Sequence, residues 1–251
     1  FAGLSYGFWQ RKHNKHHQKP NFIDEDPDIN IRVLSFTVES RNRKRGFERW
    51  LSNRQGYLFP ILLFFTGFDL LLDSFKGLVR KERSAGIRAL EFSLMLVRQT
   101  GPYLLMGWFF GWLWAIALWA FMMMIFGFFM GAAFAPNHKG MPLIEKGSKI
   151  DFFSRQVLTS RNIKGSWLKD NLMGGLNYQV EHHLFPSMPR PHLRKAHKLV
   201  VEFCKERGVP LTEMSLMASY GVVMRYLNKV GLSKNADPFV CPLVAQLRPI
   251  F

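Results

Sequence analysis

The feature that most constrains the fold is a run of forty residues, 99–138, that contains no Asp, Glu, Lys or Arg. As one straight helix this run would be about 60 Å long, twice the roughly 30 Å thickness of the hydrocarbon core of a bilayer. We therefore expect a transmembrane hairpin of two helices. Trp collects at membrane–water interfaces, and four Trp residues lie between positions 108 and 119. They place the expected turn near residues 114–119.

The net charge of +16 suggests an anionic partner, either nucleic acid or a membrane surface. The chain has 24 Phe, 7 Trp and 12 Met, many of them in uncharged runs. This content favours an integral membrane protein whose basic segments face the cytoplasm. Lipid headgroups are then a natural partner for the basic run at residues 41–49. Residues 57–72, apolar except for Asp69, are too short to span and predict an interfacial or buried helix.

Two stretches of five residues hold five of the eight histidines. In a helix His13, His16 and His17 would share one face, because residues i, i+3 and i+4 are neighbours there. The second stretch repeats this spacing at Gln179, His182 and His183. Converging neutral imidazoles bind Zn, Cu, Fe or Ni. Either stretch alone could be a basic surface helix, but the matched spacing of the two favours a metal site.

A sixth histidine, His138, stands next to Asn137 where the uncharged run ends. If the run crosses the membrane twice, His138 emerges on the side of the first stretch and becomes a candidate ligand. A zinc hydrolase site needs three protein ligands and an open position, so six histidines favour a dinuclear centre instead. His192 and His197 lack a matching spacing and are interpreted as surface residues.

Acidic residues gather at positions 24–28 of this basic chain. They could form a solvated loop, or they could accept the second ring N–H of metal-bound histidines, as carboxylates commonly do. The candidates for this supporting role are Asp24, Asp26 and Asp28, together with Gln179, Asn137 and Asn177. Cys204 and Cys241 form no motif and are interpreted as ordinary residues of a reduced protein.

The motifs occur in an order that resembles the membrane fatty acid desaturases. They are His13-x-x-His16-His17, then Asn137-His138 after the hairpin, then Gln179-x-x-His182-His183. Residues 134–142 and 177–190 look like the bacterial acyl-lipid or acyl-CoA members, and Gln179 in place of a first His is similar to the front-end, linoleoyl-CoA-like branch. The likeness runs from residue 1 to about residue 230.

One motif of the family is missing, an earlier box of the form His-x-x-x-His or His-x-x-x-x-His. The first residue is Phe rather than Met, so we expect an N-terminally truncated chain. Alone, such a chain is expected to bind iron weakly and not to desaturate.

The resemblance implies an all-α, multi-pass protein of the bacterial cytoplasmic membrane, with a cytosolic helical cap that carries the boxes. It implies two irons, held by His13, His16, His17, His138, His182 and His183. With O2 they would form a double bond in a long-chain acyl-CoA or acyl lipid. No cytochrome b5 haem motif is present, so an external donor of the ferredoxin/reductase type is expected.

Two alternatives stay open at this point, a hydroxylase of the same superfamily and a non-catalytic membrane metal-binding protein. In either case the expected organisation is one domain over residues 1–236, with the hairpin at 99–138, followed by a tail over residues 237–251.

Overall fold

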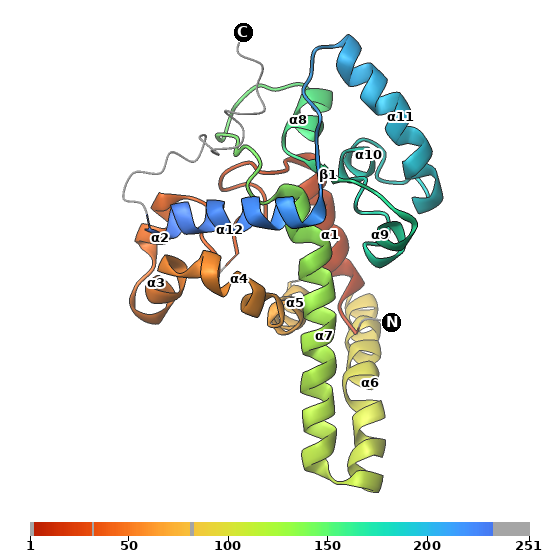
Figure 1. Ribbon diagram of the computed structural model, residues 1–251. Helices are drawn as coiled ribbons and strands as arrows, with labels where there is room; N and C mark the ends of the chain where they lie inside the picture. Colours follow the sequence, from red (N-terminus) through yellow and green to blue (C-terminus); the bar gives the residue numbers. More distant parts are fainter. Residues whose placement is uncertain (1–2, 32, 81–82, 233–251) are drawn as a thin grey trace. The chain divides into compact units, whose positions relative to one another are not determined.

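The computed structural model describes residues 3–31, 33–80 and 83–232, which are mostly helical (Figure 1). The predicted all-α class is confirmed at this level. The chain forms two compact units, residues 1–14 with 60–132 and residues 15–59 with 133–251. Three helices pass from one unit into the other: α1 (Tyr6–Gln18), α4 (Gln55–Leu63) and α7 (Trp112–His138).

The first unit is built on α5 (Thr66–Val79), α6 (Ala85–Phe110) and most of α7. The hydroxyl of Ser84 caps α6 by accepting a hydrogen bond from the amide of Ile87. α6 and α7 run side by side (Figure 1), and the indole of Trp119 donates to the side-chain oxygen of Gln99 at 3.0 Å. One buried cluster of this unit contains Leu71, Leu78, Met95 and Met123.

Two glycines let α5 and α7 approach closely. A Cβ added at Gly67 would clash with the backbone carbonyl of Met123, and one added at Gly127 would clash with the backbone nitrogen of Gly67. Small residues at such a crossing allow the helix backbones themselves to touch, as in many membrane helix pairs.

The turn between α6 and α7 lies at Gly111, so the predicted turn at residues 114–119 is wrong. Gly111 has a φ of +93°, a conformation that glycine adopts readily because it has no Cβ. The tryptophans that suggested a later turn instead belong to the ends of the two helices, with Trp108 in α6 and Trp112 and Trp114 in α7.

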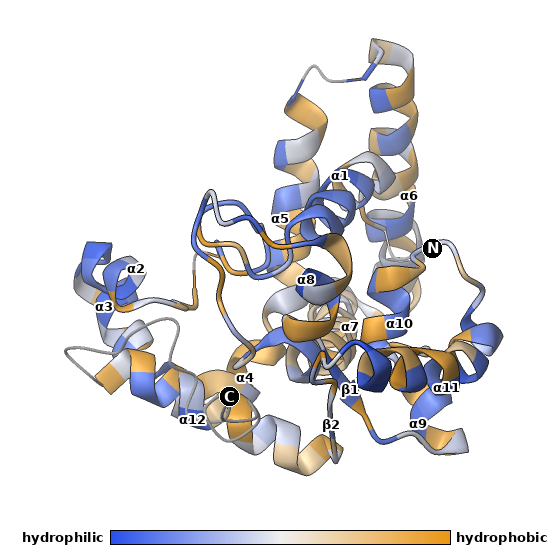
Figure 2. Ribbon diagram, turned by 90° about the horizontal axis from the view of Figure 1, so that it is seen from above, coloured by the Kyte–Doolittle hydropathy of each residue, from blue (hydrophilic) through white to orange (hydrophobic). Residues whose placement is uncertain are grey.

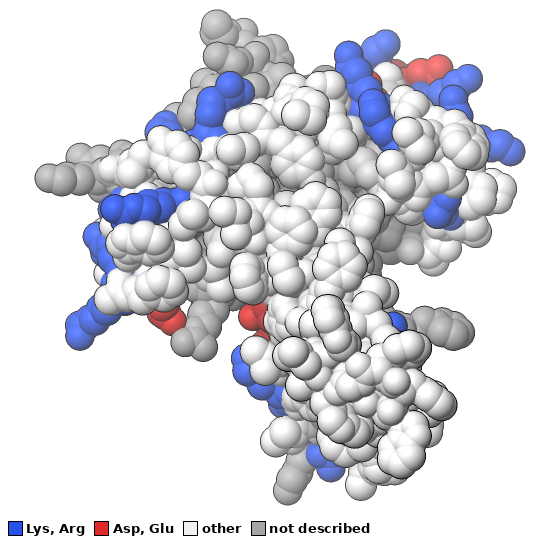
Figure 3. Space-filling view, turned by 60° about the horizontal axis from the view of Figure 1, so that its bottom comes forward, with Lys and Arg blue, Asp and Glu red and all other residues white. Residues whose placement is uncertain are grey.

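Among the described residues, α7 is the one helix that is long and apolar enough to cross a membrane by itself. The buried share of its most apolar 18-residue window is 17%, whereas the core helix of a soluble protein is mostly buried. On both sides of the turn, Trp108, Leu113 and Trp114 expose 80%, 77% and 68% of their surface. Figure 3 shows this end of the α6–α7 pair without charged side chains.

The segment over residues 57–72 differs from the single helix expected there. α4 ends at Leu63 and α5 begins at Thr66, with a bend of 74° between them. Only together are the two helices long and apolar enough to cross a membrane. The break follows Pro60, which removes a helix hydrogen-bond donor. That this segment does not cross a membrane stays a prediction.

The second unit contains the shorter helices and a two-stranded parallel sheet of β1 (Arg161–Ile163) and β2 (Thr212–Met214). Its helices are α2 (Val38–Arg43), α3 (Gly46–Asn53), α8 (Phe152–Leu158), α9 (Trp167–Leu172), α10 (Gln179–Leu184), α11 (Arg190–Glu206) and α12 (Leu216–Leu232). Figure 2 shows α11 in both orange and blue, as expected of an amphipathic helix.

The apolar side of α11 packs against α8 and α10 through Val157, Val180, Val200 and Cys204. Cys204 is therefore a core residue, and burial raises the pKa of its thiol to about 11. A thiol of that pKa stays neutral, which agrees with the interpretation of Cys204 as an ordinary residue. Cys241 and the expected tail at 237–251 lie outside the described residues.

Candidate metal centre

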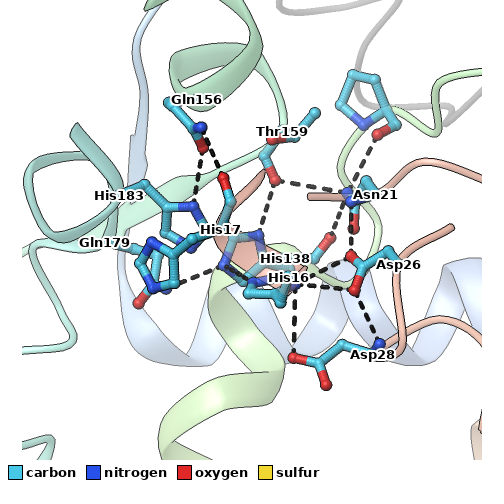
Figure 4. Close-up of polar contacts among 11 residues, drawn as sticks. His16, His17, Asn21, Asp26, Asp28, His138, Gln156, Thr159, Gln179 and His183 are labelled. Atoms are coloured by element: carbon cyan, nitrogen blue, oxygen red, sulfur yellow. Dashed lines mark hydrogen bonds and ion pairs between the residues drawn. The ribbon is translucent and has the colours of Figure 1, made fainter. Parts of the chain in front are cut away.

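Three histidines from distant parts of the sequence meet inside the second unit. His16 comes from the last turn of α1, His138 ends α7, and His183 lies in α10. One ring nitrogen of each lies within 4.8 Å of the others, and the Nε2 atoms of His16 and His138 are 3.4 Å apart. Figure 4 draws the three side chains next to one another. All three are buried.

The other ring nitrogen of each histidine faces an oxygen. Nδ1 of His16 lies 2.9 Å from the Asp26 carboxylate, Nδ1 of His138 lies 3.0 Å from the Thr159 carbonyl, and Nδ1 of His183 lies 2.9 Å from Oε1 of Gln156. A carbonyl or carboxylate oxygen only accepts, so each Nδ1 must carry the proton. The three Nε2 atoms then keep their lone pairs, which is the form that ligates a metal.

The orientation of the Gln156 amide is fixed independently. Its Nε2 donates to the backbone carbonyl of His17 at 2.9 Å, which leaves Oε1 to accept from His183. Thr159 and Gln156 lie in or just after α8, so this helix supports two of the three imidazoles. Neither residue belongs to a periodic pattern, and both were missed in the sequence analysis.

The environment of His183 suits a metal ion. Burial lowers the pKa of His183 well below its usual value, and the nearby imidazoles of His138 and His16 lower it further. Its Nε2 is buried and has no hydrogen-bond partner among the described residues. A buried polar atom of this kind costs about 1–3 kcal/mol. A metal cation held by neutral imidazoles would satisfy it, so the residues present fit a metal.

Two more predicted ligands lie beside this trio. The rings of His17 and His182 have centroids 4.8 Å apart, and the ring of His17 stacks on that of His183 at 4.2 Å. His13 belongs to the first unit, one helical turn before His17 on α1. Its role as a ligand stays a prediction.

Gln179 and Asn137, both named as possible supports, form a polar pair beside His138. The Gln179 amide nitrogen lies 2.9 Å from Nε2 of His138, and its oxygen accepts from Nδ2 of Asn137 at 2.9 Å. A metal on His138 would therefore take the place of the Gln179 contact.

The other residues proposed as supports differ in position. Asp26 is fully buried on His16, and Asp28 lies 3.6 Å from Nδ1 of His16. Asp24 is exposed in a turn with a φ of +63°. Asn177 is buried elsewhere: its side-chain amide donates to the Asp170 carboxylate at 2.8 Å, and its backbone carbonyl accepts from the backbone amide of Ile163.

The interpretation of His197 as a surface residue is wrong. Its Nδ1 lies 2.9 Å from the buried carboxylate of Glu181, which also accepts from Asn162 at 2.8 Å. This hydrogen bond to Glu181 raises the pKa of His197. The pair could not be recognised from residue spacing, because Glu181 and His197 lie on different helices. His192 is exposed, as predicted.

Known proteins are similar to this chain over most of its length. A family model described as "Fatty acid desaturase" matches residues 1–215. The chain is 33% identical over 243 residues to an "Acyl-lipid (9-3)-desaturase" of Physcomitrium patens, covering 91% of this chain and 45% of that protein. It is 30% identical over 247 residues to the "Delta(6)-fatty-acid desaturase fat-3" of Caenorhabditis elegans, covering 91% of this chain and 54% of the relative.

A third relative is a "Delta 8-(E)-sphingolipid desaturase" of Komagataella phaffii. It is 30% identical over 255 residues, which cover 92% of this chain and 46% of that protein. The chain thus spans about half the length of the curated relatives it matches.

Proposed function

Because this chain belongs to the fatty acid desaturase family, we propose that it carries the oxygen-dependent metal centre of an enzyme that forms a double bond in a long acyl chain. In that reaction O2 takes two hydrogens from neighbouring methylenes, together with two electrons and two protons, and leaves as two waters. The acyl group would be carried on CoA or in a lipid, and the electrons would come from a separate ferredoxin/reductase-type donor.

The observation that supports this proposal best is the set of oriented imidazoles. His16, His138 and His183 all present Nε2 to one point, and each is locked by an oxygen on Nδ1. We assign two irons to the cluster, with the ligands His13, His16, His17, His138, His182 and His183. Bound iron would supply the activation of O2, which amino-acid side chains cannot carry out.

The residues of the chain itself position the ligands and exclude water. Asp26, Thr159 and Gln156 each fix one imidazole in the ligating tautomer before any metal arrives. The burial of all three rings would keep bulk water from a bound metal. Such supports commonly change metal affinity about 10–100-fold when they are removed.

We further propose that α6 and α7 form the transmembrane hairpin of a multi-pass protein and that the histidine boxes lie on its cytoplasmic side. The long exposed apolar surface of α7 supports the membrane assignment. Residues 1–236 would act as one desaturase domain despite the two compact units. A bacterial cytoplasmic membrane is the expected location.

The test is expression of the chain, with and without the coding sequence that adjoins it in its gene, in a host that lacks the activity. Fatty acids are analysed by mass spectrometry and iron by elemental analysis. We expect a new double bond with the longer form, and none with His138→Ala. His192→Ala, an exposed histidine of the same unit, should leave the product unchanged. A hydroxylated product, or full activity of His138→Ala, would contradict the proposal.

A further inference from the structure

The metal centre does not account for the basic run at residues 41–49. One residue of this run, Arg41, is buried rather than exposed. Its Nη1 donates to the backbone carbonyls of Val230 and Gly231 near the end of α12, at 3.1 and 2.8 Å. Arg41 therefore stabilises the fold and is not a headgroup ligand. Other basic residues of α2 and α3 remain at the surface, where Figure 3 shows Lys and Arg side chains at the left edge.

Two aromatic side chains stand exposed among these charges. Phe47 and Trp50 lie one helical turn apart on α3 and expose 73% and 45% of their surface. Their rings stack at 5.6 Å and 14°. The guanidinium of Arg54 lies over the Trp50 ring at 4.8 Å. This combination of Trp, Phe and Arg is typical of the interface between lipid headgroups and acyl chains.

The charge of the segment also suits an anionic surface. Residues 38–54 contain six basic and two acidic residues, a net charge of +4. One of the acids, Glu39, is already paired with Arg43. Lys44 has no hydrogen-bond acceptor for its buried Nζ among the described residues. Burial lowers the pKa of Lys44 to about 8, and the charge of Glu48 offsets part of that shift.

The position of α3 in the chain points to a membrane rather than to an acidic protein. α4 begins at Gln55, directly after Arg54. Together, α4 and α5 are long and apolar enough to cross a membrane, although they are bent relative to each other. Tyr57 and Ile61 of α4 are exposed like Phe47. Exposed apolar side chains thus continue from the aromatic pair into this segment.

We propose that α3 lies in the headgroup layer of an anionic bilayer, with Phe47 and Trp50 inserted and Arg45 and Arg54 bound to lipid phosphates. The inference goes beyond the proposed function, because it concerns the lipid that the protein selects and not the metal centre. It predicts a local contact that needs negatively charged lipid.

The test uses the full chain in nanodiscs of phosphatidylcholine, alone or mixed with phosphatidylglycerol. An environment-sensitive fluorophore is attached at Phe47→Cys after Cys204→Ala and Cys241→Ser remove the other thiols. A matched control carries the label at Trp167→Cys, since Trp167 of α9 is as exposed, at 77%, but does not precede an apolar helix.

We expect the label at position 47 to shift to the blue and to resist iodide quenching only in the anionic discs. High salt should reverse this, because it screens exposed charges. Each basic residue near an anionic membrane changes partitioning about fivefold, so Arg45→Gln with Arg54→Gln should lower the inserted-to-free ratio about 25-fold. Both residues are exposed, and an unchanged circular dichroism spectrum checks the fold of the double variant.

Three results would overturn the proposal. The label at position 47 could behave identically in the two lipid compositions. The label at position 167 could shift as much as the label at 47, which would remove the specificity for α3. Finally, polyglutamate could protect position 47 in neutral discs as well as anionic lipid does, which would assign the surface to an acidic protein. None of these readouts depends on desaturase activity.

Discussion

Replacing Asp26 by Asn should weaken both the fold and the metal centre, although the change is nearly isosteric. Each carboxylate oxygen of Asp26 accepts from Nδ1 of His16, at 2.9 and 3.0 Å. One oxygen also accepts from the backbone N–H of Asn21 at 2.7 Å, and the other accepts from the backbone N–H of Asp28 at 2.8 Å. The group is fully buried, so water cannot replace a lost partner.

The size of the effect follows from this geometry. Whichever way the new amide turns, its NH2 group faces one of the two backbone N–H groups, and that donor loses its acceptor. An unsatisfied buried group costs about 1–3 kcal/mol, so we expect the free energy of unfolding to fall by that amount. The remaining oxygen holds His16 less firmly, and metal affinity should fall about 10–100-fold.

The assay pairs urea unfolding, followed by circular dichroism, with equilibrium dialysis against Co(II) as a spectroscopic substitute for iron. The control is Asp24→Asn two residues earlier. Asp24 is exposed, and Asn tolerates its φ of +63°. If both variants unfold and bind Co(II) alike, the carboxylate of Asp26 does not support the centre.

Three further predictions concern single side chains. Gln156→Leu removes the acceptor of one imidazole and should lower Co(II) affinity about 10–100-fold in dialysis, whereas Gln156→Glu keeps the acceptor and should lose less. His197→Gln should reduce the free energy of unfolding most below about pH 6.5, and the loss should become smaller as the pH rises through the raised pKa of His197. The control His192→Gln, at an exposed position, should show no such pH dependence. Gly67→Ala should cost about 1–3 kcal/mol by overpacking the α5–α7 crossing. It should lower the melting temperature, and Gly86→Ala, with open space around it, should not.

Each of these three predictions would be contradicted by a specific result. Equal Co(II) affinity in the Leu and Glu variants at position 156 would mean that the tautomer of His183 is set elsewhere. A pH-independent effect at position 197 would mean that the protonated ring is not what stabilises the pair with Glu181. Equal melting temperatures at positions 67 and 86 would contradict the close approach of α5 and α7.

The sequence predicted the residues of the candidate site better than their supports. The spacing of the histidine boxes and the position of His138 at the end of an uncharged run are local patterns, and such patterns can be seen in one dimension. Gln156 and Thr159 act through contacts with partners 21 or more positions away, and nothing in their own neighbourhood marks them. His197 was misread for the same reason.

The long apolar helices were predicted in kind but not in detail. The absence of charge over residues 99–138 correctly indicated apolar helices, since composition alone decides that property. The turn was misplaced because it was inferred from the Trp residues, whereas the chain turns at Gly111, the glycine of this run that has a positive φ. The helix break after Pro60 was missed because the hydrophobic pattern continues across it.

The distance along the chain between the three imidazoles has a consequence during synthesis. His16 leaves the ribosome 183 − 16 = 167 residues before His183, a delay of about 8–33 s at roughly 5–20 residues per second. Throughout that interval α1 can present His13, His16 and His17 while the cluster is still incomplete. Isolated imidazoles bind copper and zinc more tightly than ferrous iron. We therefore expect the metal loaded at this site to depend on which ions the cell leaves free while the chain is still being made.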